Sequence, residues 1–165
     1  MAYIGGIVTG FYLFASAPGI HKKKKWQHLT GWDYAHRGLY DNEHGIPENS
    51  MAAFRRAVDK GYGIELDVHL TADNQLVVFH DDTLTRMCGM NKKISSFLYS
   101  DLMQLRLIGT EEGIPLFKDV LELIDGKVPL IIELKVDGSN QNLLCPLVWQ
   151  LLSRYKGDYC IESFH

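Results

Sequence analysis

The sequence predicts an α/β fold in which parallel strands alternate with helices. Five short apolar runs of strand type follow one another along the 165-residue chain, and helical patterns separate most of them. The run at 128–136 (VPLIIELKV) is apolar at nearly every position, which is typical of a strand buried on both faces of a parallel sheet. Strands that alternate with helices favour parallel βα units.

The composition is that of an ordinary globular domain. Hydrophobic residues make up 46% of the chain and charged residues 22%, values that fit one domain with a sizeable core. A net charge of -3 gives no reason to expect nucleic acid as a partner. The three cysteines form no CxxC pair, so we expect reduced thiols in a reducing compartment or small buried apolar residues.

The N-terminal segment differs from the rest of the chain. Residues 2–20 carry no charge and are followed directly by HKKKKW. About 20 apolar residues suffice to span a bilayer. A cleaved signal peptide would carry its basic residues before the apolar run, and four lysines fit a membrane edge better than the end of a buried helix. We therefore predict a transmembrane anchor at 1–21, a basic linker at 22–32 and a catalytic domain at 33–165, which the positive-inside rule places in the cytoplasm.

The first half of the predicted domain contains three strands and one helix. The stretch 32–38 (WDYAHRG) has the pattern of a short strand. The stretch 49–61 has helical spacing, with Asn49 or Ser50 as its N-cap and Gly61 as its end. In 63–71 (GIELDVHLT) apolar and polar residues alternate with the period of a strand. The turn ADNQ then leads into a further strand, 76–82.

The second half continues with helices and two more strands. The stretch 116–126 places four apolar residues on one helical face and ends at Gly126. The apolar strand 128–136 follows. The remaining predictions are a short capped helix at 100–107, a longer helix at 142–157 that bends or begins near Pro146, and a strand at 159–164.

Five strands are too few for a complete (β/α) barrel. Eight strand–helix units typically take about 250 residues. The chain is therefore either part of a longer barrel protein or a smaller, open α/β fold. We favour the former, because a chain that stops inside a strand would leave an apolar edge unpaired.

Ionisable residues gather where the predicted strands end. Active sites of parallel α/β sheets lie beyond the carboxyl ends of the strands, so we expect these side chains to meet. Four consecutive strands carry such residues, which is more than we would expect of charged side chains that merely face solvent. The residues are His36 and Arg37, Glu65 and Asp67, His80 and Asp81, and Glu133 and Lys135.

The carboxylates of this group predict a metal site. Glu65, Asp67 and Glu133 are oxygen donors of the kind that bind a hard divalent cation such as Mg²⁺ or Ca²⁺. Without a cation, three carboxylates so close would repel one another, and some would have to stay protonated. Zinc fits less well, because no cysteine lies near and histidine ligands would be expected. On an edge strand, the same carboxylates would simply face solvent. His69 shares their strand face but lies at its far end, and we assign it no role.

The histidines and basic residues predict phosphodiester cleavage. His36 and His80 lie on different strands and could act as general base and general acid on opposite sides of a substrate. Arg37 suits anionic phosphate oxygens through its planar fork, and Lys135 suits them as a point charge. Singly, each histidine is more often structural, and Glu133 with Lys135 could be a simple ion pair. The prediction depends on the combination.

Several stretches of the sequence resemble the glycerophosphodiester phosphodiesterase family. They occur in order over most of 34–135, so the resemblance is specific. It implies an α/β fold of the (β/α)8 TIM-barrel type, of which this chain holds about the first five strands. The matching stretches are AHRG (35–38), PENSMAAF (47–54), GYGIELDVHLTADNQLVVFHDDTLTRMCG (61–89), LIIELK (130–135) and, for a later strand, IESF (161–164).

The resemblance also implies an activity and a role for each matching residue. Enzymes of this family hydrolyse glycerophosphodiesters to glycerol 3-phosphate and an alcohol with a divalent cation. The glycerol's own 2-hydroxyl is thought to attack phosphorus, which explains why no Ser or Cys nucleophile is needed. Residues 82–113 match a small insertion over the barrel mouth. By position, His36 and His80 match the acid–base pair, Glu65, Asp67 and Glu133 the metal ligands, Arg37 and Lys135 the phosphate-binding residues, and Glu48 and Asn49 a loop beside the metal.

Two further functions stay open at this point. A phosphoinositide-type phospholipase shares the barrel and the paired histidines and would act on lipid in the bilayer. A non-catalytic membrane module could keep a residual metal site without turnover. For a membrane-anchored glycerophosphodiester phosphodiesterase, the function favoured here, we expect a small glycerophosphodiester as substrate, a membrane contact through 1–21 and no nucleic acid.

Overall fold

The computed structural model describes residues 27–164. The predicted anchor at 1–21 and residues 22–26 of the predicted linker at 22–32 therefore lie outside the described residues. Among the helices in 27–164, none combines the length and the apolar character that crossing a bilayer requires. The three cysteines are free thiols, as expected, and Cys145 is exposed.

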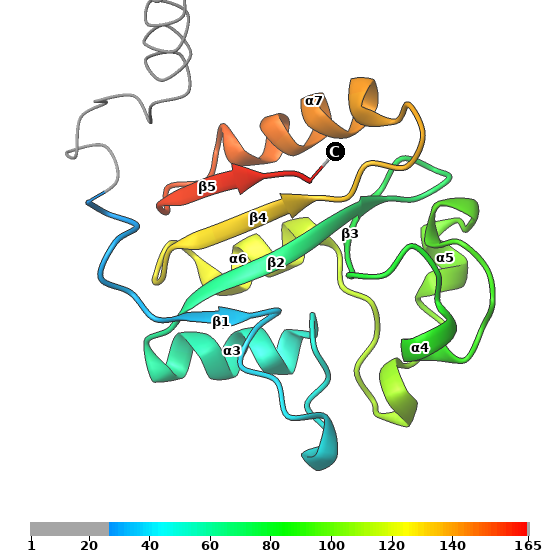
Figure 1. Ribbon diagram of the computed structural model, residues 1–165, viewed down its shortest axis with the longest axis horizontal. Helices are drawn as coiled ribbons and strands as arrows, with labels where there is room; N and C mark the ends of the chain where they lie inside the picture. Colours follow the sequence, from blue (N-terminus) through cyan, green and yellow to red (C-terminus); the bar gives the residue numbers. More distant parts are fainter. Residues whose placement is uncertain (1–26, 165) are drawn as a thin grey trace, which may run out of the picture.

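Four parallel strands form the main sheet, in the order β1-β2-β4-β5 (Figure 1). Helices α3, α6 and α7 connect or follow these strands, and this repeated strand–helix pattern is the first part of a (β/α) barrel. The predicted fold class is confirmed. The bounds are β1 (Tyr34–His36), α3 (Met51–Lys60), β2 (Gly63–Leu70), α6 (Phe117–Ile124), β4 (Leu130–Leu134), α7 (Gln141–Leu152) and β5 (Tyr159–Glu162).

The third predicted strand runs in the opposite direction from the other four. β3 (Leu76–Val78) pairs antiparallel with the second half of β2, because the turn between them is too short for a parallel crossover. Val68 is in register with Val78 of β3 and also with Leu134 of β4, so β3 and β4 lie on opposite edges of β2. Since β1 also lies opposite β4, β1 and β3 share one edge of β2, one after the other.

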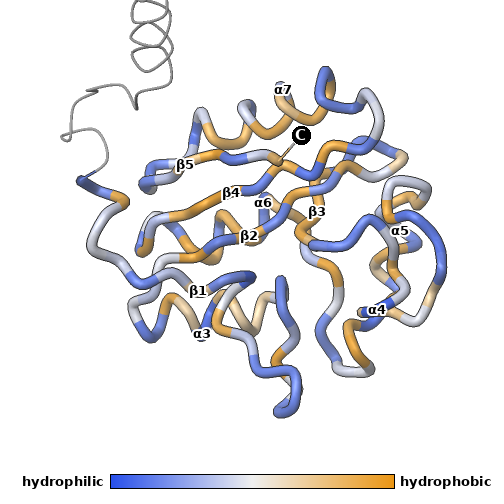
Figure 2. Tube along the Cα trace, in the orientation of Figure 1, coloured by the Kyte–Doolittle hydropathy of each residue, from blue (hydrophilic) through white to orange (hydrophobic). Residues whose placement is uncertain are grey.

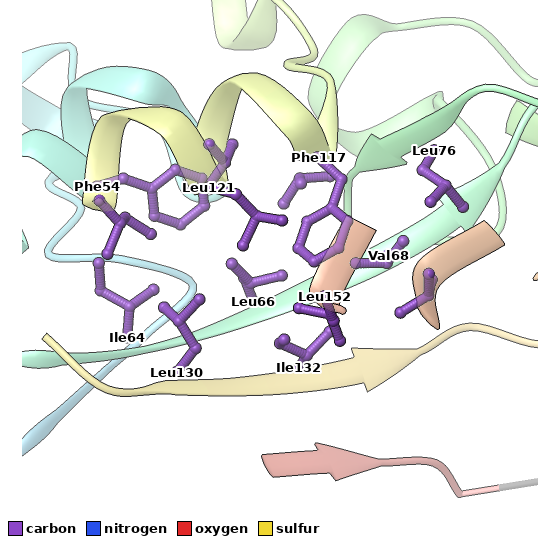
Figure 3. Close-up of a cluster of buried hydrophobic side chains, with 14 of the residues drawn as sticks. Phe54, Ile64, Leu66, Val68, Leu76, Phe117, Leu121, Leu130, Ile132 and Leu152 are labelled. Carbon is purple, nitrogen blue, oxygen red and sulfur yellow. The ribbon is translucent and has the colours of Figure 1, made fainter. Parts of the chain in front are cut away.

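The core lies between the sheet and its three main helices. The apolar residues of β2 point to this side, where Leu66 packs with Phe54 of α3 and Phe117 of α6 (Figure 3). Hydrophobic and hydrophilic positions alternate along β2, whereas β4 is hydrophobic over most of its length (Figure 2). Burial of these apolar side chains is the main source of stability for the sheet and the helices together.

The helix ends follow the predicted signals with small differences. The Ser50 hydroxyl accepts a hydrogen bond from the backbone N–H of Ala53, and Gly61 ends α3 in the left-handed region. Helix α6 ends at Ile124, and its C-cap Asp125, one residue before the predicted Gly126, takes the left-handed conformation. Helix α7 begins before Pro146 and runs through it, so the alternative of a start near Pro146 is wrong.

The segment after β3 forms a small unit with its own apolar cluster. Its buried residues include Phe79, Leu84 and Ile94, and they are separate from the main core. The predicted helix at 100–107 is shorter than expected and ends at Leu102. The short elements outside the main sheet are η1 (Asn42–His44), α4 (Thr85–Cys88), η2 (Ile94–Ser96), α5 (Tyr99–Leu102) and η3 (Leu107–Gly109).

Candidate active site

Strand direction brings the two candidate histidines toward the same part of β2. β1 runs parallel to β2 and ends at His36, in register with Glu65. β3 runs back along the same edge, and the N–H of Phe79, just before His80, donates to the Asp67 carbonyl at 3.0 Å. The sequence predicts His80 at the end of a parallel strand. The antiparallel return of β3 instead brings it in from the opposite direction.

Three carboxylates converge on the polar face of the sheet. Asp67 of β2 and Glu133 of β4 are in register, so they share one face with Glu65. One oxygen of each carboxylate lies within 4.8 Å of an oxygen of the other two, and all three residues are buried. We call Glu65, Asp67 and Glu133 the acidic triad.

The negative charge of the acidic triad is only partly compensated. Burial, followed by the neighbouring charge of Asp67, raises the pKa of Glu65 from 4.5 to about 7. The Lys135 ammonium lies 2.6 Å from a Glu133 carboxylate oxygen and 3.0 Å from Asp67 Oδ1. One ammonium therefore serves two carboxylates, and Glu65 keeps its proton more tightly than an ordinary glutamate.

Arg37 lies beside the triad in a strained conformation. Its φ of 59° is in the left-handed region, which directs its backbone N–H to Glu65 Oε2 at 2.9 Å. The following Gly38 has no room for a side chain, since a Cβ would lie 2.9 Å from Ala53 Cβ. In the Arg37 guanidinium, Nη1 donates to Glu48 at 2.9 Å, whereas Nε is buried without a hydrogen-bond partner. Nε also lies 3.8 Å from Asp67 Oδ2, so the guanidinium is held between Glu48 and Asp67. Within the described residues its Nη2 makes no hydrogen bond, and this nitrogen is left for an anion.

Asn49 holds the central carboxylate of the triad. Its backbone is also left-handed, with a φ of 53°, and its N–H donates to the Arg37 carbonyl at 2.9 Å. The side-chain Nδ2 donates to Asp67 Oδ2 at 2.8 Å, while the amide oxygen is buried without a partner. The neighbouring Ser50 caps α3, so the two adjacent residues divide the predicted tasks: Asn49 serves the site and Ser50 the helix.

The two histidines have different surroundings. The His36 side chain is 66% exposed, and its Nε2 lies 3.9 Å from Glu65 Oε2. The His80 ring is more enclosed, and its Nδ1 is 2.7 Å from Asp81 Oδ1. Because an ionised carboxylate can only accept, Nδ1 carries the proton in this contact and Nε2 is directed elsewhere. The Asp81 carboxylate therefore sets the tautomer of His80.

Two residues near the site received no role from the sequence. Arg86 of α4 binds both Glu48 and Asp81. His69 is buried, and its Nε2 lies 3.2 Å from the His80 carbonyl, so it fixes the backbone that carries His80. The alternation in 63–71 marks His69 as part of the polar face. No local signal marks Arg86, because its partners lie five and 38 residues away.

The residues present fit a hard divalent cation. Carboxylates are preferred ligands of Mg²⁺ and Ca²⁺. The raised pKa of Glu65 indicates uncompensated negative charge, which a cation would offset. Among the described residues this group contains neither a cysteine nor a histidine, which argues against a zinc site. The acidic triad would hold the cation, with Asn49 and Lys135 keeping its carboxylates in place.

Comparison with protein families shows a match to one family model. Residues 36–153 match the model described as the glycerophosphoryl diester phosphodiesterase family. A lysophospholipase D of Rattus norvegicus is 34% identical over 173 aligned positions, which cover 96% of this chain and 52% of that protein. A glycerophosphodiester phosphodiesterase of Bacillus altitudinis is 37% identical over 113 positions, covering 64% of this chain and 45% of the relative. The chain thus spans about half the length of the curated relatives it matches.

Solved structures show the same architecture. The structure of an Oleispira antarctica phosphodiesterase in complex with its product sn-glycerol-3-phosphate superposes with a TM-score of 0.73 at 27% identity. The superposition covers 81% of this chain and 57% of that protein. The fold described above therefore matches more than half of that structure.

Proposed function

We propose that the protein hydrolyses glycerophosphodiesters to glycerol 3-phosphate and an alcohol, because the chain belongs to the glycerophosphoryl diester phosphodiesterase family, whose model matches residues 36–153. The chain covers about half of its curated relatives, so this activity is proposed for the full-length protein. The observation that carries the proposal is the acidic triad between two histidines that approach β2 from opposite strand directions.

Each residue of the site has a defined task in this reaction. Arg37, whose Nη2 makes no hydrogen bond to the described residues, binds the anionic oxygens of the phosphodiester. One imidazole, of His36 or His80, accepts the proton of the attacking hydroxyl, and the other donates a proton to the departing alcohol oxygen. In this first step the bond from the glycerol 2-oxygen to phosphorus forms as the bond to the alcohol breaks, which leaves a cyclic phosphate. Water then attacks phosphorus as the bond to the 2-oxygen breaks, with the two imidazoles exchanging roles, and the product is glycerol 3-phosphate.

A divalent cation on the acidic triad would supply positive charge to the phosphoryl oxygens when bound. Lys135 supports this site, because its ammonium is held against Glu133 and Asp67 at the carboxyl end of β4. In this proposal Glu48 and Asn49 do not touch the substrate; each holds another residue of the site in place. Glu48 orients Arg37, and Asn49 orients Asp67.

Membrane attachment and location belong to the same proposal. The uncharged segment 2–20 and the lysines that follow it support a single membrane anchor, with the catalytic domain in the cytoplasm. A membrane-bound enzyme of this kind would meet lipid-derived substrates at the bilayer surface. The anchor is tested by carbonate extraction of membranes: full-length protein that washes off would contradict it.

A second substrate class is favoured by one observation. The lysophospholipase D of Rattus norvegicus aligns over 96% of this chain, whereas the glycerophosphodiester phosphodiesterase of Bacillus altitudinis aligns over 64%. A lysophospholipid is a glycerophosphodiester that keeps one acyl chain, so the same phosphoryl chemistry applies to it. With this substrate the product would be an acylated glycerol phosphate.

The deciding assay is release of the phosphate monoester from a panel of phosphodiesters by the full-length protein. Glycerophosphocholine, lysophosphatidylcholine and phosphatidylinositol would be supplied with Mg²⁺ or Ca²⁺ and again after removal of metal with EDTA. We expect turnover of one of the first two, its loss on chelation and its return with added cation. Activity on phosphatidylinositol alone would favour the phospholipase reading. No turnover of any substrate would favour a non-catalytic module, and turnover that survives chelation would refute the metal site.

A further inference from the structure

Arg86 joins two parts of the site that are far apart in the sequence. It lies on α4, in the small unit that follows β3. On one side, its Nε and Nη2 donate to the two oxygens of Asp81 at 2.8 and 2.9 Å. On the other side, its Nη1 and Nη2 donate to the two oxygens of Glu48 at 2.8 and 2.7 Å. The guanidinium is therefore bound in a bidentate manner to two carboxylates at once.

The two arginines of the site differ in how many donors they have left. The remaining Nη1 proton of Arg86 faces Met87 Sδ at 3.1 Å, so all five N–H donors of Arg86 have a partner. Arg37 shares the Glu48 carboxylate and lies 3.8 Å from Asp67 Oδ2, but within the described residues its Nη2 makes no hydrogen bond. Arg37 is thus available to bind an anion, whereas Arg86 is fully committed to protein carboxylates.

The contacts of Arg86 lead to one catalytic group. Asp81 accepts a hydrogen bond from His80 Nδ1 and is held by Arg86 on its other side. A carboxylate held by a planar fork cannot rotate freely, so the imidazole bound to it keeps one orientation and one tautomer. The same guanidinium holds Glu48, which holds Arg37. Arg86 therefore contacts both the carboxylate that binds His80 and the carboxylate that binds Arg37.

We propose that Arg86 is the positioning residue of this site: by clamping Asp81 and Glu48 together, it fixes His80 in its Nδ1–H tautomer and sets Arg37 at the phosphate. This inference rests on the proposed function only for its catalytic consequence, since the tautomer of His80 is a property of the protein itself. Arg86 does not touch the substrate. It couples the small unit 82–113 to the sheet through charge-assisted hydrogen bonds.

The first test uses Arg86→Gln in the full-length protein, which removes the fork and keeps a side chain of similar length. We expect kcat to fall about 10- to 100-fold, the usual range for residues that orient catalytic groups. Arg106→Gln is the matched control, because Arg106 is exposed and its side chain donates only to the carbonyls of Met103 and Leu105. A normal kcat in Arg86→Gln would overturn the proposal.

The second readout is nuclear magnetic resonance of the histidine ring nitrogens, which a purely structural role would not change. We expect His80 in the parent and in Arg106→Gln to show one Nδ1–H tautomer. In Arg86→Gln both tautomers should be populated. An unchanged tautomer would overturn the proposal even if the protein hydrolysed none of the tested phosphodiesters, so this result is independent of the proposed activity.

Two further variants protect the test against loss of folding. Arg86→Lys keeps the charge but cannot bind two carboxylates in a bidentate manner, so it should resemble Arg86→Gln. Arg86→Ala should regain part of its kcat when guanidinium is added at low, non-denaturing concentration, and Arg106→Ala should not respond. Full activity of Arg86→Lys, or no response of a folded Arg86→Ala, would show that orientation by the fork is not required.

Discussion

Two groups of buried or half-buried acidic residues lie side by side in this molecule, and their charges are compensated in opposite ways. The acidic triad has one lysine between two of its carboxylates, and the pKa of Glu65 is raised to about 7 by burial and by Asp67. Glu48 and Asp81, which we call the arginine-bridged pair, are clamped by Arg86. Burial would raise their pKa values too, but hydrogen bonds from Arg86 outweigh it, and the pKa of Asp81 falls to about 2.

The difference separates two uses of a buried carboxylate. Where the chain supplies its own arginine, the carboxylate is a fixed anion that orients neighbouring groups. Where the chain supplies too little positive charge, the carboxylates cost free energy that an external cation can offset. The direction of the pKa shift therefore indicates which group orients catalytic residues and which one is built for a metal.

The largest expected effect concerns the histidines that both groups serve. His80→Ala and His36→Ala in the full-length protein should each lower kcat at least about 100-fold, as is typical for loss of a general acid or base. His44→Ala is the matched control, because His44 is exposed and paired only locally with Asp41. Steady-state kinetics on the preferred phosphodiester measures the effect. Near-normal turnover of either variant would remove the paired-histidine mechanism.

The next effect compares the stability contributions of the two groups. Glu48→Gln should lower the free energy of unfolding by about 2 kcal/mol, because it weakens charge-assisted hydrogen bonds to two arginines. Glu65→Gln, measured with EDTA at pH 8, should raise it by about 1 kcal/mol, because an uncompensated buried charge is removed. Urea unfolding provides both values, and Glu122→Gln on the exposed side of α6 is the control. Equal signs for the two variants would contradict the comparison.

The smallest effect is a pH dependence of opposite sign in the two groups. The folded pKa of Glu65 lies above its ordinary 4.5, so its stabilising contribution is complete below pH 4.5 and is lost as the pH rises to about 7. The folded pKa of Asp81 lies below its ordinary 3.8, so its contribution is present above pH 3.8 and is lost as the pH falls toward 2.

Unfolding in EDTA measures the free energy of unfolding as a function of pH, which should fall above pH 4.5 (the upper limb) and below pH 3.8 (the lower limb). Glu65→Gln should flatten only the upper limb, between pH 4.5 and 7, and Asp81→Asn only the lower one. Added Mg²⁺ or Ca²⁺ should reverse the upper limb, because a cation binds the ionised triad more strongly. An upper limb that persists unchanged in Glu65→Gln would show that another group causes it.

Much of the fold could be predicted because its signals are local. The alternation in 63–71 identifies β2 and separates its apolar face from its polar one. The cap at Ser50 and the stop at Gly61 set α3 within a residue or two. The direction of β3 could also have been derived, because a four-residue turn cannot carry a parallel crossover.

The sequence alone determined the kinds of residue that the strand ends would carry, since alternation and strand order depend on the chain's own periodicity. Only the tertiary structure decided how these residues are shared: which carboxylates an arginine compensates, and which are left for a cation. Arg86 and Glu48 are 38 residues apart, and no local pattern relates them. Their contact depends on how the small unit packs against the sheet, because electrostatic pairing is set by distance in space, not by separation along the chain.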